Sequence, residues 1–196
     1  MNYRPITDVW ILGRSKTKDP ETGKSYYGAY PAGFLERARP MLVGGNEDAC
    51  ILHVCSGHAR GYNGKKGGIT LSGFGKNDLT LDIDPLCKPD ILADARNLPT
   101  VAGFYVGRAF DAILIDRPYS YEDAKNYRCG PDVLPDLNKL LTDCLRLTDG
   151  LVGVIDYAWP SAKGAKEVAA IAVGTGRNAR ARWFTVWKKT KKELAQ

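Results

Sequence analysis

The chain has 196 residues, of which 44% are hydrophobic and 26% charged, the balance of a globular domain that needs no disulfide staple. Its apolar runs are too short to cross a membrane and its first residues contain no apolar signal segment, so we expect a cytoplasmic protein. The five cysteines include no close pair and no Cys/His cluster, which argues against a metal site and indicates reduced thiols.

The formal net charge is +6, and the positive residues gather in short clusters. An excess of positive charge favours polyanionic partners, and tryptophans are interleaved near the last two clusters, so the pattern favours nucleic acid. Solvated loops and a frayed tail would give single clusters as well. The clusters are Arg14-Lys16-Lys18, Lys65-Lys66, Arg177-Arg180-Arg182 and Lys188-Lys189-Lys191-Lys192, with Trp183 and Trp187 beside them.

The first half of the chain begins with a polar stretch at 14–29 that carries turn signals, followed by a predicted short helix, Phe34–Leu42, which Gly44-Gly45 ends. Short apolar segments then alternate with helical or loop segments, which is typical of a mostly parallel sheet with helices on its faces. The strands predicted in this way are Cys50–Cys55, Leu79–Ile83, Ile91–Ala93, Ala112–Ile115 and Leu151–Ile155.

The clearest helix is Val133–Leu147, in which leucines recur at helical spacing and which Asp149-Gly150 should end. Two further apolar segments, Val168–Val173 and Arg182–Lys188, flank a glycine-rich turn. This hairpin pattern predicts that an antiparallel strand completes the sheet.

Three of the first four predicted strands end in an aspartate. Ligands bind beyond the carboxyl ends of the strands in an open parallel sheet, so the residues there are the candidates for a site. The first strand is followed by Ser56-Gly57, where glycine lets a backbone approach a cofactor closely. Asp82 follows the second strand and could accept hydrogen bonds from both hydroxyls of a ribose. Asp94-Ala95 follows the third strand, and Asp116 follows the fourth.

Other polar residues near the strands have simpler interpretations. Asp90, Asp111 and Asp156 are interpreted as edge or capping residues. His53 lies inside a predicted strand and is expected to be a core histidine with its hydrogen bonds satisfied. His58, in the glycine turn, lies beside a cofactor or in a solvated loop.

Taken in order, these segments resemble the motifs of class I S-adenosylmethionine-dependent methyltransferases. The likeness is carried by Cys55-Ser56-Gly57, Asp82-Ile83-Asp84-Pro85, Ala93–Pro99, Phe110–Asp116, the helix before Asp149-Gly150, and the final hairpin. The resemblance implies an α/β fold: a Rossmann-like, mostly parallel seven-stranded sheet with an antiparallel last strand, helices on both faces, and some helices shortened or missing. It also implies that S-adenosylmethionine is the cofactor, bound by Cys55, Ser56, Gly57, Asp82, Asp94, Ala95 and Asp116.

Asp116-Arg117-Pro118-Tyr119 is similar to the [DN]PPY motif of methyltransferases that modify exocyclic amino groups of adenine or cytosine in DNA. The resemblance implies that Asp116, Pro118 and Tyr119 are catalytic and that DNA is the partner. The Asp116 carboxylate and the carbonyl of Arg117 would accept hydrogen bonds from the amino group, and Pro118 would hold that carbonyl outward. Tyr119 would stack on a base swung out of the duplex.

The resemblance further implies one methyltransferase domain, 1–196. Residues 1–48 would pack on the cofactor site, residues 49–190 would form the catalytic sheet, and residues 191–196 would be a tail. Thr7–Trp10 and Tyr30–Arg37 are similar to the segment that leads into the cofactor motif of the family.

The chain also departs from the family pattern. His53 and Cys55 replace an acidic and an aromatic residue of the cofactor motif, and Arg117 replaces the first proline of the catalytic motif. No segment is left for a separate target-recognition domain. Methylation of RNA or of a small molecule, and a non-catalytic nucleic-acid-binding subunit with this fold, therefore stay open. A nicotinamide-dependent dehydrogenase is disfavoured, because the first turn lacks the G-x-G-x-x-G spacing.

Overall fold

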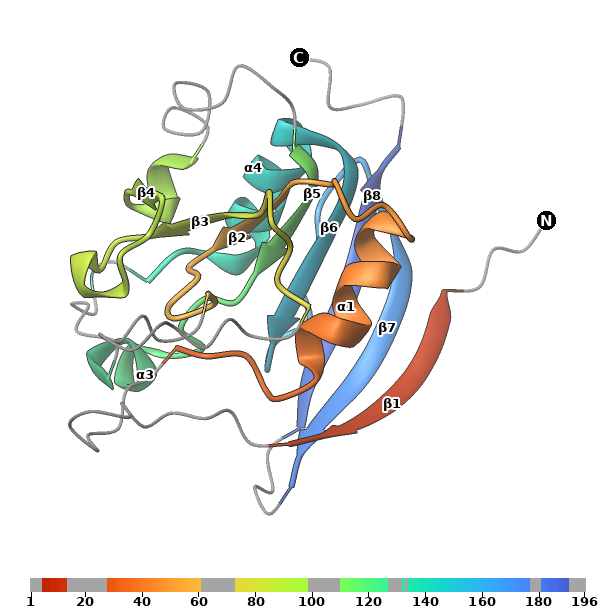
Figure 1. Ribbon diagram of the computed structural model, residues 1–196, viewed down its shortest axis with the longest axis horizontal. Coiled ribbons are helices and arrows are strands. Elements are labelled where there is room, and N and C mark those ends of the chain that lie inside the picture. Colours follow the sequence, from red (N-terminus) through yellow and green to blue (C-terminus); the bar gives the residue numbers. More distant parts are fainter. Residues whose placement is uncertain are drawn as a thin grey trace.

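A single eight-stranded sheet runs through the molecule (Figure 1). The computed structural model describes residues 5–13, 28–60, 73–98, 110–126, 132, 134–176 and 181–190. The strands are β1 (Ile6–Leu12), β2 (Ile51–Val54), β3 (Leu79–Asp82), β4 (Ile91–Leu92), β5 (Phe110–Ile115), β6 (Thr148–Asp156), β7 (Ala165–Thr175) and β8 (Ala181–Lys189). The α-helices are α1 (Phe34–Val43), α3 (Tyr121–Asn126) and α4 (Leu137–Leu147), with 3-10 turns η1 (Pro85–Cys87) and η2 (Ala95–Asn97).

The strand order is β1-β7-β8-β6-β5-β2-β3-β4. Strand β8 is antiparallel to both of its neighbours, β6 and β7, and every other adjacent pair is parallel. The predicted mixed sheet, with its antiparallel last strand, is therefore confirmed. From β2 the chain moves outward to β3 and β4, then returns to place β5 on the other side of β2, so the strand order reverses between β2 and β5.

The predicted number of seven strands is wrong because β1 adds an eighth. It pairs in parallel with β7, at the edge of the sheet. Only Trp10 and Leu12 of its seven residues are buried, and its apolar run, Val9–Leu12, is only four residues long and follows the polar pair Thr7-Asp8. The Trp10 ring packs against Phe34 of α1 at 6.2 Å and Phe184 of β8 at 5.6 Å between centroids, which fixes β1 to the core.

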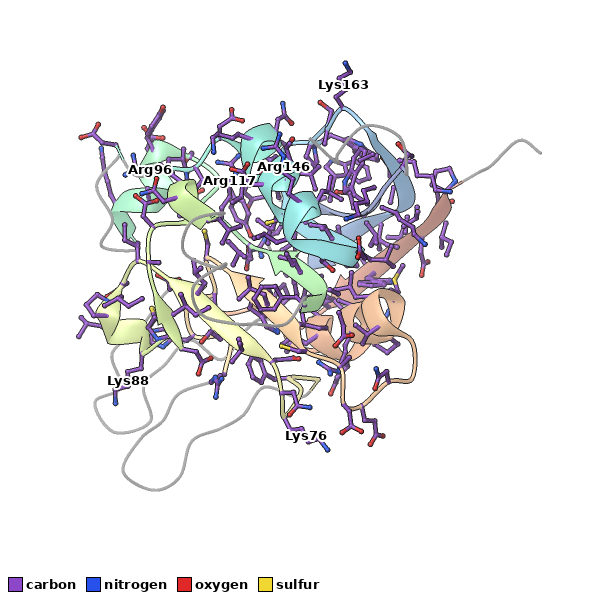
Figure 2. The ribbon with its side chains drawn as sticks, turned by 90° about the horizontal axis from the view of Figure 1, so that it is seen from above. Lys76, Lys88, Arg96, Arg117, Arg146 and Lys163 are labelled. Atoms are coloured by element: carbon purple, nitrogen blue, oxygen red, sulfur yellow. The ribbon has the colours of Figure 1, made fainter. Side chains whose placement is uncertain are left out.

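Helices cover both faces of the sheet, as predicted. Figure 2 views the sheet with α1 on one side and α4 on the other. Successive side chains of a strand point to opposite faces, and β5 divides accordingly between two cores. Ile113 and Ile115 pack with α4, whereas Ala112 and Leu114 pack with α1.

The two long helices begin and end for local reasons. Helix α1 ends at Gly44, whose φ of 62° lies in the left-handed region that glycine tolerates. Helix α4 begins later than the predicted Val133, because Asp136 caps it by accepting a hydrogen bond of 2.7 Å from the Lys139 amide. Asp149-Gly150 does not end this helix, since α4 passes at Thr148 directly into β6.

Short connections replace helices elsewhere. Between β3 and β4 the chain makes only the 3-10 turn η1, consistent with the shortened helices predicted for this fold. Ser120 caps α3 by accepting a hydrogen bond of 3.1 Å from the Asp123 amide. In the described part of the chain, no helix combines the length and apolarity needed to span a membrane.

Candidate functional site

The carboxyl ends of the parallel strands bring the predicted site residues to one edge of the sheet. Val54 at the end of β2 is level with Leu81 of β3 and Ile115 of β5, and Ile115 is level with Val154 of β6. The residues that follow these positions therefore line one edge. They are Cys55, Ser56 and Gly57 after β2, Asp82 at the end of β3, Asp94 and Ala95 after β4, Asp116 after β5 and Asp156 at the end of β6.

The turn after β2 is held tightly on two sides. Cys55 has a φ of 55°, a left-handed conformation that is uncommon outside glycine. The Gly57 amide donates a hydrogen bond of 2.7 Å to Asp82 Oδ2. A Cβ on Gly57 would lie 2.2 Å from the carbonyl oxygen of Gly28, which also accepts a hydrogen bond from the His58 amide. The segment before α1 therefore packs directly on this turn.

Asp82 combines a structural role with spare acceptor capacity. Its Oδ1 accepts a hydrogen bond of 2.9 Å from the Asp84 amide, and burial raises the pKa of the Asp82 carboxyl. The Ile83 amide also donates to this carboxylate. Two carboxylate oxygens offer about four lone-pair positions, so these three backbone donors leave Asp82 able to accept about one more hydrogen bond. Beside it, the buried Ser56 hydroxyl has no hydrogen-bond partner among the described residues. The Asp82 carboxylate and the Ser56 hydroxyl therefore both offer unused hydrogen-bonding capacity next to the turn after β2.

Asp94 lies at the same edge, but its carboxylate already has partners. It caps η2, accepting a 2.9 Å hydrogen bond from the Arg96 amide, and its carboxylate also binds the Arg96 guanidinium at 2.6 Å. These bonds to Arg96 hold the pKa of the Asp94 carboxyl below its usual value. The next residue, Ala95, is buried in the core. The Asp94 carboxylate is therefore largely occupied by its neighbour.

Asp116 and Tyr119, predicted to act together, are in direct contact. The Tyr119 hydroxyl donates a hydrogen bond of 2.7 Å to Asp116 Oδ1. Burial raises the pKa of Asp116 to about 6, and the nearby Asp156 adds to the rise, while Arg182 and the Tyr119 hydroxyl oppose it. This carboxyl consequently changes its charge close to neutral pH.

Arg117, which departs from the family motif, forms a buried ion pair. Its Nε lies 3.0 Å from Asp156 Oδ2, without the alignment of a hydrogen bond, and its Nη1 donates to the carbonyl of Pro118 at 3.1 Å. In Figure 2, Arg117 lies on the α4 side of the sheet. Asp156 also accepts a 2.8 Å hydrogen bond from the Ala158 amide. Asp156, interpreted from the sequence as an edge or capping residue, does cap the turn at Ala158, and its carboxylate also pairs with Arg117 of the predicted catalytic loop.

An aromatic and cationic cluster surrounds Tyr119. The ring of Tyr157 meets that of Tyr119 edge-on, with centroids 4.5 Å apart. The Arg182 guanidinium lies over both rings, 5.2 Å from the Tyr119 centroid and 6.0 Å from that of Tyr157. Arg182 was grouped with the basic clusters by sequence, but it is partly buried at this site rather than solvated. Only its position at the start of a predicted strand distinguished it from its neighbours.

His53 is a satisfied core histidine, as predicted. Its Nδ1 lies 3.2 Å from the Tyr30 hydroxyl and its Nε2 lies 3.2 Å from Asp78 Oδ2, which also binds Arg39 at 2.6 Å. Burial lowers the pKa of His53. Burial, followed by the negative charge of Asp116, raises the pKa of Tyr30 well above its usual value. The segment before α1 thus extends from this buried network to the site.

The described residues provide little support for a single basic surface. Lys188 is exposed, Lys189 pairs with Asp149, and the cations labelled in Figure 2 project from both sides of the sheet. Lys76 lies on the α1 side, and Arg146 lies on the α4 side. The remaining cations of the predicted clusters, namely Arg14, Lys16, Lys18, Lys65, Lys66, Arg177, Arg180, Lys191 and Lys192, lie outside the described residues.

Within the described ranges, no three His, Cys, Asp or Glu side chains are grouped so that they could hold a metal ion. Among the described residues, Cys50, Cys55, Cys87 and Cys144 are not joined by disulfide bonds. No protein-family model, curated protein or solved structure matches this chain. The geometry of the sheet edge is therefore the basis for any functional conclusion.

Proposed function

We propose that the protein is an S-adenosylmethionine-dependent methyltransferase that modifies an exocyclic amino group of a base in DNA. The observation that carries this proposal is the reversal of strand order between β2 and β5. With β2 counted as the first strand, β4-β3-β2-β5-β6 is the 3-2-1-4-5 order of doubly wound Rossmann-like sheets. Such sheets bind their ligands at this reversal, outside the carboxyl ends of the strands.

The groups at the reversal suit this cofactor. S-adenosylmethionine, when bound, supplies an electrophilic methyl group. Asp82 has acceptor capacity for a ribose hydroxyl, and the Ser56 hydroxyl is buried without a partner among the described residues. A buried polar group without a partner costs about 1–3 kcal/mol, which a ligand hydrogen bond would remove. Gly57 would contribute its backbone to the wall of the pocket.

Asp116 is the residue that would engage the acceptor. In its ionised form a carboxylate only accepts hydrogen bonds, so it would orient an amino group and draw electron density toward the nitrogen. Alignment of the acceptor nitrogen supplies much of the remaining rate enhancement. The ion pair between Arg117 and Asp156 fixes the loop between Asp116 and Tyr119. Pro118, which stands at the second proline of the family motif, would help to hold the same loop.

A second candidate, methylation of RNA or of a small amine, is favoured by the surroundings of Tyr119. Its ring already contacts Arg182 on a face and Tyr157 at an edge, which leaves less room for an extruded base. A small amine, or a base that is already unpaired, would depend less on stacking against the Tyr119 ring. The two candidates share the cofactor and Asp116 and differ only in the acceptor.

The test is transfer of labelled methyl from S-adenosylmethionine to duplex DNA, single-stranded DNA, RNA, protein and small amines. We expect transfer to DNA that Asp116→Asn removes. Binding to DNA should weaken with salt, with a log–log slope of about −0.9 per phosphate engaged. Transfer to RNA or small amines alone would support the second candidate. Cofactor binding without transfer to any acceptor would contradict both and leave a non-catalytic binding subunit.

A further inference from the structure

Arg182 occupies a position in the site that the sequence did not assign. It comes from β8, the antiparallel strand, whereas the other site residues follow parallel strands. Its guanidinium covers the Tyr119 ring at 5.2 Å, and the hydroxyl of the same ring donates to Asp116 at 2.7 Å. Tyr119 is therefore held between a cation on its face and a carboxylate at its hydroxyl.

We propose that Arg182 is a positioning residue of the acceptor site, which seats Tyr119 and supplies the positive charge that faces Asp116. The inference rests on the proposed function, since Asp116 engages the acceptor there. A guanidinium is suited to the task because its plane stacks on aromatic rings and it stays charged at all relevant pH values.

The charge balance around Asp116 depends on this one residue. Arg117, the other cation of the site, is paired with Asp156, so Arg182 is the charge that opposes the burial of Asp116. The titratable and charged groups that face Asp116 from the surrounding elements are Tyr119 on its own loop, Asp156 on β6, Arg182 on β8, Cys55 after β2 and Tyr30 before α1. Without Arg182, this environment would favour the protonated carboxyl.

The experiment compares Arg182→Met, which removes the charge, with Arg182→Lys, which keeps it. Asp116 is titrated by NMR in protein labelled with carbon-13 at the aspartate carboxyls, and its signal is assigned by its absence from Asp116→Asn. The parent midpoint should lie at about 6. An opposite charge nearby lowers a carboxyl pKa by about 1–3, so Arg182→Met should raise the midpoint to about 7 or above. Arg182→Lys should stay close to the parent.

Methyl transfer is measured on the same variants. If the midpoint moves from about 6 to about 7, the ionised fraction at pH 6 falls about fivefold, while at pH 8 it barely changes. The Arg182→Met defect should therefore shrink with rising pH, which a general loss of structure would not produce. The matched control is Arg37→Met. Arg37 of α1 also stacks on an aromatic ring, that of Trp10 of β1 at 5.8 Å, but this pair is not part of the candidate site.

The outcomes separate the two proposals. An unchanged Asp116 midpoint in Arg182→Met, or a defect that is equal at pH 6 and pH 8, would overturn the role of Arg182. A raised midpoint in a parent protein that methylates no acceptor would instead overturn the proposed function. Near-ultraviolet circular dichroism verifies that the variants fold, and Arg182→Gln, which also removes the charge, takes the place of Arg182→Met if that variant does not fold.

Discussion

At the scale of single residues, Asp82 and Asp94 make a matched pair. Both end their strands at the same edge, but Asp82 has acceptor capacity left, whereas Asp94 is occupied by Arg96. We predict that Asp82→Asn weakens cofactor binding about tenfold or more, because a hydrogen bond to a charged group contributes about 1.5–3 kcal/mol. Asp94→Asn should change the affinity by less than about threefold, as for a partly exposed ion pair.

Calorimetric titration with S-adenosylmethionine and with its demethylated product measures both variants. Equal losses for Asp82→Asn and Asp94→Asn would mean that the spare capacity of Asp82 has no role in binding.

The second residue-scale prediction concerns Asp116. Since the ionised carboxylate is the stronger hydrogen-bond acceptor and carries the negative charge, whereas the protonated carboxyl also presents a donor, the parent rate should rise with pH, with its midpoint at the pKa of about 6 and a plateau above it. Asp116→Asn should lower the initial rate about 100-fold or more at pH 8 while leaving cofactor affinity nearly unchanged. A variant that methylates at the parent rate would remove Asp116 from the chemistry.

The matched control for this variant is Asp111→Asn. Asp111 lies at the opposite end of the same strand, where it accepts a hydrogen bond from the Cys50 amide. Its substitution should leave both the rate and its pH midpoint in place.

At the scale of elements, the strands that are most deeply buried were the easiest to predict from the sequence. The strands β2 to β8 could be predicted because each contains a short, mostly apolar segment, which leaves few alternatives to a buried strand. Strand β1 could not, since it exposes one face and carries Thr7 and Asp8 within its span. The start of α4 was placed too early, because Leu134 fits the helical spacing although Asp136 supplies the cap.

Some parts of the candidate site could likewise be predicted from the sequence, and others could not. Residues adjacent to strand ends, such as Gly57, Asp82 and Asp116, could be predicted because sequence order alone places them at the edge. The pairing of Arg117 with Asp156 and the seating of Arg182 over Tyr119 depend on which strands become neighbours. No local spacing contains that information.

Strand β1 provides a prediction at this scale. Trp10 is buried against Phe34 and Phe184, whereas Val9 is 64% exposed on the opposite face. Trp10→Ala should lower the free energy of unfolding by about 3–5 kcal/mol, as large-to-small core changes do. Val9→Ala should change it by about 0.5 kcal/mol or less, as for surface positions. Urea midpoints compare the two, and equal midpoints would mean that β1 does not belong to the core.

At the scale of the whole molecule, one edge of the sheet carries buried acids whose ionisation opposes folding. Burial raises the pKa of Asp82, Asp116 and Asp156 above their usual value. A carboxyl whose folded pKa is raised stabilises the fold at low pH and loses that contribution as pH rises through the folded pKa. His53 acts in the opposite direction, since its lowered pKa costs stability as pH falls below about 6.5.

The contribution of Asp116 can be isolated by subtracting the free energy of unfolding of Asp116→Asn from that of the parent, because the other titrating groups are common to both proteins. From pH 5 to pH 8 the parent should lose about 1.4 kcal/mol of unfolding free energy relative to the variant, given a folded pKa of about 6 and an ordinary value of 3.8. Denaturant titrations at the two pH values measure it. A difference that stays constant with pH would show that Asp116 titrates as it does in the unfolded chain.

The position of β1 also affects how the protein is made. It is synthesised before its neighbour in the described sheet, β7, which begins about 150 residues later in the chain. At about 5–20 residues per second, β1 waits roughly 10 to 30 s for its hydrogen-bond partner. During that time Trp10 lacks the Phe184 side of its pocket. A nascent chain therefore holds the apolar residues of β1 without a docking site until β7 and β8 have been synthesised, and a chain cut short before β7 would never bury them.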